Sequence, residues 1–270
     1  MTLSILAYQS DLWTLGSALF STSVAIKMNG LLYLPAIGLL LTQALGVSRT
    51  IRQITTMLSI QVGWRVFILT KVLYALPFVL HHARSYMQMS FNFNRQFLYT
   101  WSVNWKFLDE ETFLSTQFSR TLLATHAVLL LLFANRNWTR PRGGSVVKLC
   151  RSLLRMPSPH EKYKLHQRLN PTFILTTFTT CNLIGVVCAR SLHYQFYSWF
   201  AWWTPYLLFK GGFHPVLTYA LWFAQEVAWN IYPSAAWSSA IVVAIPNLIL
   251  LAIFFQNQDG KTPRRNGIKE

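Results

Sequence analysis

The chain has 270 residues, of which 53% are hydrophobic and only 12% are charged, and it carries a net charge of +16. A soluble domain carries roughly 25% charged residues, so the composition excludes a soluble enzyme, and three cysteines cannot form a secreted disulfide framework. The Lys and Arg residues lie between apolar runs, which favours a membrane protein with basic cytoplasmic loops over a nucleic-acid-binding protein.

Apolar runs predict about eight membrane spans, because a helix needs about 20 mostly apolar residues to cross a bilayer. The third run is the least regular, since Arg65 and Lys71 lie inside it. Lipid cannot satisfy open backbone groups, so the sequence predicts an all-α integral membrane bundle over residues 1–256, followed by a basic tail at 257–270. The candidate spans are 11–26, 31–48, 64–82, 118–134, 172–189, 196–210, 214–232 and 237–256.

The distribution of charge predicts the orientation of this bundle. Residues 135–171 contain many Lys and Arg residues and a single acid, Glu161, so this loop and the basic tail are expected in the cytoplasm. The other long loop, 83–117, is neutral and is expected on the opposite side. The glycosylation sequon that begins at Asn137 would then be cytoplasmic and unmodified.

Four polar groups fall on the side away from the cytoplasm, which predicts that any chemistry occurs there. Arg suits phosphate oxygens, while His, Tyr and Gln can hydrogen-bond to phosphate or sugar hydroxyls. The alternative is an aromatic and basic belt at the membrane interface. The candidate binding residues are Lys27, Asn29, Arg95, Trp101, Asn104, Trp105, Arg190, His193, Tyr194 and Gln195.

Two of these groups allow a more specific reading. Phe97, Trp101 and Trp105 recur every four residues, which predicts an interfacial helix that acts as an anchor or as a platform for a sugar or lipid headgroup. Glu226 is an acid inside an apolar segment, so it is a candidate catalytic carboxylate or a structural partner of Arg190. The histidines lack a fixed ligand set, so no metal site is expected.

Several sequence strings resemble the Not56-like family of dolichyl-phosphate-mannose-dependent α-1,3-mannosyltransferases. They are WTLGS at 13–17, VAIKMN at 24–29, TWSVNWKFL at 100–108 and ARSLHYQFYSW at 189–199. The resemblance implies a class C glycosyltransferase fold in the endoplasmic reticulum membrane, with 83–117 as a lumenal loop. It also implies mannose transfer from dolichyl-phosphate mannose to the dolichyl-pyrophosphate-linked pentamannosyl oligosaccharide. No cofactor, metal or nucleic acid is expected, and the partners are these two substrates and membrane lipids.

The chain departs from the family pattern in two places. Family members are longer at the N-terminus and carry an acidic motif there, so we expect a truncated chain for which no catalytic base is assigned and Glu226 is a candidate. Residues 62–71 look like an insertion, which a gene-model error would explain. Two other functions therefore stay open: a catalytically inactive membrane fragment acting as a binding or structural bundle, and a lipid or sugar transporter. No internal repeat supports the transporter.

Overall fold

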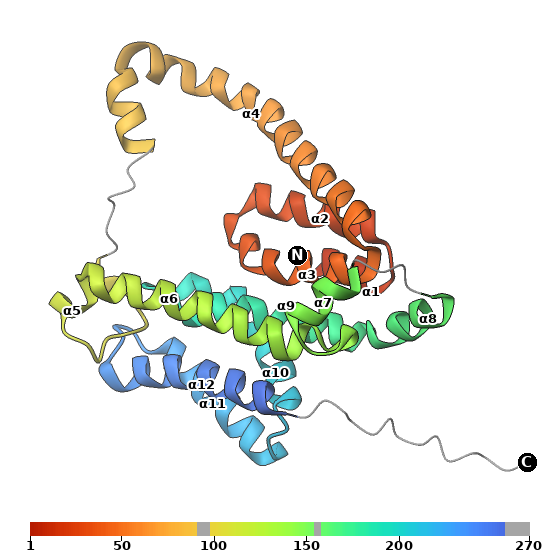
Figure 1. The fold of residues 1–270 in the computed structure, drawn as a ribbon. Helices are drawn as coiled ribbons and strands as arrows, with labels where there is room; N and C mark the ends of the chain where they lie inside the picture. Colours follow the sequence, from red (N-terminus) through yellow and green to blue (C-terminus); the bar gives the residue numbers. More distant parts are fainter. Residues whose placement is uncertain (91–97, 154–157, 257–270) are drawn as a thin grey trace, which may run out of the picture.

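The computed structural model describes residues 1–90, 98–153 and 158–256, and within these ranges all regular structure is helical (Figure 1). Most helices begin at a proline or at a side chain that caps the first turn, as at Asn170 before the central helix. The basic tail at 257–270 and the candidate Arg95 lie outside the described residues. The α-helices are α1 (Thr2–Gln9), α2 (Trp13–Ile26), α3 (Leu34–Leu45), α4 (Val47–Ser90), α5 (Glu110–Leu114), α6 (Thr116–Phe133), α7 (Val146–Leu153), α8 (Pro159–Arg168), α9 (Pro171–Val187), α10 (Thr204–Lys210), α11 (Pro215–Asn230) and α12 (Ala236–Phe255), and the short helical turns are η1 (Met28–Tyr33), η2 (Tyr99–Trp101), η3 (Ala134–Trp138), η4 (Arg140–Arg142), η5 (Tyr194–Trp199) and η6 (Ala201–Trp203).

Helix α9 is the centre of the bundle. It packs against α1, α3, α6, α10 and α12, and almost every side chain from Ile174 to Val186 is buried. Three of its hydroxyls need no outside acceptor, because Thr176, Thr179 and Thr180 donate to carbonyls of the preceding turn of α9. A helix that is buried on all sides can therefore carry several hydroxyls without an unsatisfied donor.

Among the residues that the structure describes, three helical segments are long and apolar enough to cross a membrane, which confirms an all-helical protein of membrane type. They are Met28–Leu45, Thr116–Trp138 and Ala236–Phe255, and they match the predicted spans 31–48, 118–134 and 237–256. The predicted spans 11–26, 172–189 and 214–232 correspond to the shorter helices α2, α9 and α11. The total of eight spans stays a prediction.

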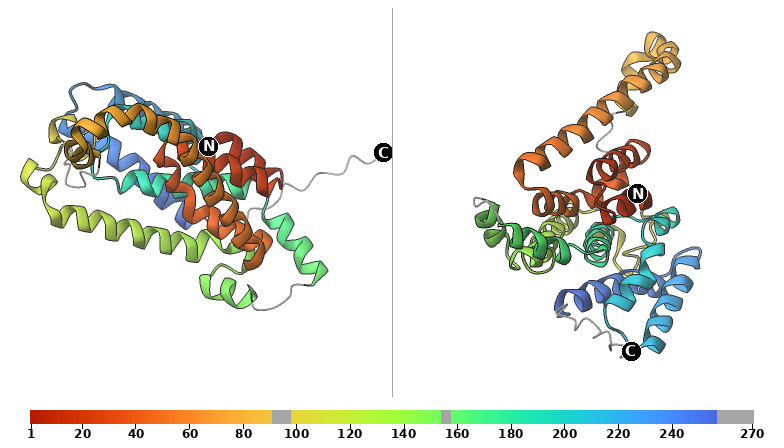
Figure 2. Two further views of the ribbon diagram at one scale, coloured as in Figure 1. Left: turned by 90° about the horizontal axis from the view of Figure 1, so that it is seen from above. Right: turned by 90° about the vertical axis from the view of Figure 1, so that its right-hand side faces the viewer.

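The predicted span 196–210 is wrong as a single helix. The chain forms η5, then η6, and only then the seven-residue helix α10. The predicted span 64–82 is part of the much longer helix α4, which arches away from the rest of the molecule (Figures 1 and 2). Pro77 cannot donate an amide to this helix, and the backbone at His82 leaves the helical region. Residues 62–71, the suspected insertion, lie within α4.

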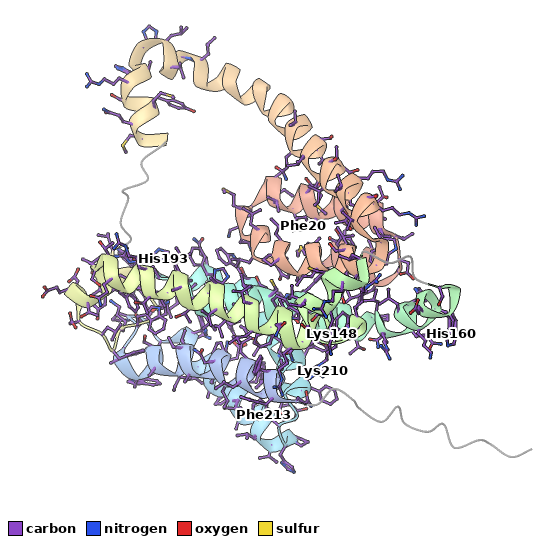
Figure 3. The ribbon with its side chains drawn as sticks, in the orientation of Figure 1. Phe20, Lys148, His160, His193, Lys210 and Phe213 are labelled. Carbon is purple, nitrogen blue, oxygen red and sulfur yellow. The ribbon has the colours of Figure 1, made fainter. Side chains whose placement is uncertain are left out.

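The loops gather at opposite ends of the molecule. We call one the basic end, which holds α7, α8 and the beginning of α4, and the other the loop end, which holds α5, residues 98–109 and η5. Figure 3 shows Lys148 and His160 toward the basic end and His193 at the loop end. The two loops that charge alone assigns to opposite sides of a membrane are thus separated along the long axis of the bundle.

Candidate functional site

The four polar groups predicted on one side converge at the loop end. His193 Nδ1 lies 3.0 Å from the Trp101 carbonyl, and the Lys27 ammonium lies 5.2 Å from the centre of the Trp199 ring. The Tyr194 hydroxyl donates to the carbonyl of Ile231. Segments from α2, residues 98–106, η5 and the end of α11 therefore meet, although they are far apart in sequence.

The interfacial helix predicted from Phe97, Trp101 and Trp105 is wrong over residues 98–108, because only Tyr99–Trp101 forms a short helical turn in this described stretch. The residues that follow are not helical, and hydrogen bonds of the Asn104 side chain, which is 1% exposed, fix their conformation. Its amide nitrogen donates to the Ala189 carbonyl, and its oxygen accepts from the Leu192 N–H and the Ser102 hydroxyl, all at 2.8–2.9 Å. These three hydrogen bonds of a buried amide, two of them to a distant loop, outweigh the local preference of this segment for a helix.

Asn104 is therefore a structural clamp, and it is not accessible to a substrate. Trp105 has the same character, because its indole N–H donates to the Ala189 carbonyl and its ring packs on Phe107 and Phe118. The Val103 N–H also donates to the Leu192 carbonyl, which adds a backbone link between the two loops.

The aromatic side chains of η5 separate onto two sides because a 3₁₀-helix repeats every three residues. On one side, Phe196 and Trp199 stack at 4.2 Å, with His193 against the edge of Phe196. The backbone carbonyl of Trp101, whose side chain is 48% exposed, lies 3.0 Å from His193 Nδ1, and the Lys27 ammonium lies over the stacked pair. We call these five residues the aromatic strip.

On the other side of η5, Tyr197 is the central residue. Its hydroxyl donates to the Glu226 carboxylate at 2.5 Å, and its ring stacks on Trp229 at 4.9 Å. Tyr194 packs against Tyr232 in the same region. Glu226 therefore pairs with a tyrosine hydroxyl and makes no ion pair with Arg190 within the described residues, so the structural pairing considered from sequence is wrong.

Arg190 instead fastens the loop to α5. Its Nε donates to the Phe113 carbonyl at 3.2 Å, and its guanidinium lies over the Phe113 ring. Asp109 caps the start of α5 by accepting from the Thr112 N–H, and this hydrogen bond lowers the pKa of the Asp109 carboxyl. Burial lowers the pKa of the Lys106 ammonium, which donates to the Tyr99 carbonyl.

Of the predicted binding residues, Lys27, Trp101 and His193 belong to the aromatic strip. Asn29 is half-buried and Gln195 is exposed at the same end. Sequence reasoning missed Phe196, Trp199 and Tyr197, whose signal was an aromatic period of three along residues 194–202. Within residues 1–90, 98–153 and 158–256, no three His, Cys, Asp or Glu side chains lie close enough to hold a metal ion.

The apolar helices define a helical protein of membrane type, and its loop end carries an exposed cation over aromatic rings. The family model described as "ALG3 protein" matches residues 1–239. The chain therefore belongs to the ALG3 family, in agreement with the resemblance of its sequence strings. No solved structure matches the chain.

Curated relatives share similar sequences across nearly the whole chain. Three of them, from Neurospora crassa, Arabidopsis thaliana and Mus musculus, are named Dol-P-Man:Man(5)GlcNAc(2)-PP-Dol alpha-1,3-mannosyltransferase. They are 37%, 34% and 35% identical over 94%, 90% and 93% of this chain, and the matches cover 56%, 54% and 54% of the relatives. The chain thus spans about half the length of the curated relatives it matches.

Proposed function

We propose that this chain acts in the endoplasmic reticulum membrane, as a multi-pass protein, in the transfer of mannose from dolichyl-phosphate mannose. The acceptor is the dolichyl-pyrophosphate-linked pentamannosyl oligosaccharide, and the new linkage is α-1,3. Family membership carries this proposal, because relatives with this named activity match at least nine-tenths of the chain. The proposed fold is that of a class C glycosyltransferase.

The reaction breaks the bond between mannose C1 and the donor phosphate oxygen and forms a bond from C1 to an acceptor hydroxyl oxygen. Dolichyl phosphate leaves, and a base takes the acceptor proton. Groups that stabilise the negative charge of the departing phosphate lower the barrier. The ammonium of Lys27 suits this role, since it is exposed and makes no ion pair among the described residues.

The aromatic strip offers a complementary surface for the uncharged parts of the substrates. Stacked rings such as Phe196 and Trp199 provide large flat apolar faces, against which sugar rings or a polyprenyl chain can pack. His193 and Gln195 can add hydrogen bonds to hydroxyls. Glu226, the candidate base within this chain, lies on the other side of η5 from Lys27, and its carboxylate accepts a hydrogen bond from the Tyr197 hydroxyl.

The proposal is tested with a chimera in which this chain replaces the matching 257-residue region of the Neurospora relative. Membranes containing the chimera should transfer labelled mannose from dolichyl-phosphate mannose to the pentamannosyl lipid acceptor. The 270-residue chain is assayed in parallel. A correctly inserted chimera without activity would contradict the proposal.

Two substitutions in the chimera test the assigned roles. Lys27→Gln should raise the KM for the donor about tenfold or more, because it removes a charged hydrogen bond to phosphate. Lys210→Gln, at the last residue of α10, is the control and should leave the KM unchanged. Glu226→Gln should lower kcat by about a hundredfold or more if Glu226 is the base. An unchanged kcat would exclude Glu226 from that role.

A further inference from the structure

The basic side chains at the basic end form two sets with different surroundings. In the first set, guanidinium groups bind backbone carbonyls at helix ends. Arg142 donates twice to the Gln43 carbonyl near the end of α3, and Arg140 donates to the Gln256 carbonyl after α12. Arg168 donates to the Pro141 carbonyl. These arginines satisfy carbonyls that the helices leave open, and they complement the negative ends of the helix dipoles.

The second set has no such partners. Its five members are exposed, and none makes a hydrogen bond or an ion pair within the part of the chain that the structure describes. They come from the beginning of α4, from α7 and from α8, which lie at the same end in all views (Figures 1 and 2). The five residues are Arg49, Arg52, Lys148, Arg151 and Lys164.

Helix α7 shows why these charges face outward together. Leu149 is buried against the molecule, whereas Lys148 and Arg151 lie on the exposed side with Val147, which is 58% exposed. Tyr163, next to Lys164 on α8, is 62% exposed. A helix with basic residues and isolated apolar side chains on its free face is typical of elements that lie in the membrane interface.

We propose that this second set binds the anionic headgroups of phospholipids in the leaflet that the basic end faces. Loop charge alone orients a membrane protein, but it does not require that five cations stay exposed and unpaired while neighbouring arginines are occupied. Lys and Arg near an anionic lipid surface attract its headgroups, and phosphate oxygens accept their charged hydrogen bonds. Val147 and Tyr163 would enter the acyl-chain boundary beside them.

The chain supplies its own site for a reporter, because Cys150 is exposed on α7, whereas Cys181 is buried. With Cys188→Ser, an environment-sensitive fluorophore is attached to Cys150 in the full chain, which is then reconstituted into phosphatidylcholine vesicles. The vesicles contain the same mole fraction of brominated phosphatidylserine or brominated phosphatidylcholine as a quencher. We expect stronger quenching by phosphatidylserine, and we expect added salt to reduce this preference.

The double variant K148Q/R151Q should lower the relative affinity for phosphatidylserine about tenfold or more, since it removes two cations from the surface. The matched control is R84Q/R120Q, which removes two exposed charges from the end of α4 and from α6, away from α7 (Figure 1). Equal quenching by the two lipids would overturn the proposal. An unchanged preference in K148Q/R151Q, or an equal loss in R84Q/R120Q, would also overturn it. The lipid measurement does not depend on mannosyl transfer.

Discussion

Replacing Asn104 with alanine removes three hydrogen bonds from the interior of the loop end. Two former partners keep another contact, because the Ala189 carbonyl still accepts from Trp105 and the Ser102 hydroxyl still donates to the backbone carbonyl at position 104. The buried Leu192 N–H loses its acceptor, which costs about 1–3 kcal/mol. When the net contribution of the other two hydrogen bonds is added, we expect the free energy of unfolding to fall by about 2–4 kcal/mol.

In a chain of this size, such a loss lowers Tm by about 4–7 °C. Tm is measured on the purified chain by tryptophan fluorescence. Asn230→Ala is the matched control, since Asn230 is exposed and its side chain bonds only to the Glu226 carbonyl one turn earlier. A decrease in Tm for Asn104→Ala no larger than for Asn230→Ala would refute the clamp between the two loops.

Three further predictions follow from side chains outside this clamp. Arg142→Gln should destabilise the chain by about 1–3 kcal/mol, because the forked guanidinium bonds to the Gln43 carbonyl are lost, and a Tm equal to that of the unaltered chain would be the contrary result. Asn137 is 7% exposed, and its side-chain amide donates to the Ile253 carbonyl, so we expect no glycan on it. Glycosidase treatment should therefore leave the electrophoretic mobility of the protein unchanged. A shift in mobility would mean that the sequon is accessible in the lumen. The pKa of Asp109 is lowered below 3.8 by the Thr112 N–H, so its cap stabilises α5 above pH 3.8 and this contribution is lost as the pH falls through the lowered value. The protection factors of the α5 amides, which are corrected for the intrinsic pH dependence of exchange, should therefore fall in acid, and Asp109→Asn should remove most of that fall.

The sequence did not predict the local form of the polar loops. Charge counting predicts opposite sides of the membrane for Lys148 and His193, which lie at opposite ends of the molecule (Figure 3), and the membrane side of each end stays a prediction. The helix predicted from Phe97, Trp101 and Trp105 was wrong, because the spacing of aromatic residues carries no information about the distant Ala189 carbonyl, to which Asn104 donates. The continuous helix over 196–210 was wrong because the apolar content of this segment hid the period of three that forms η5.

The central position of α9 has a consequence for biosynthesis. Helices α1 and α3 pack against α9, yet they are synthesised long before Pro171 begins it. Before α9 is synthesised, the faces of α1 and α3 that pack against it in the finished bundle lack this partner, and lipid or other protein segments must cover them. Once α9 is present, α10 and α12 can dock as soon as they are made. The earlier and later helices thus come together only when α9 is present, and ribosome-bound chains that end before α9 should be the most vulnerable to degradation.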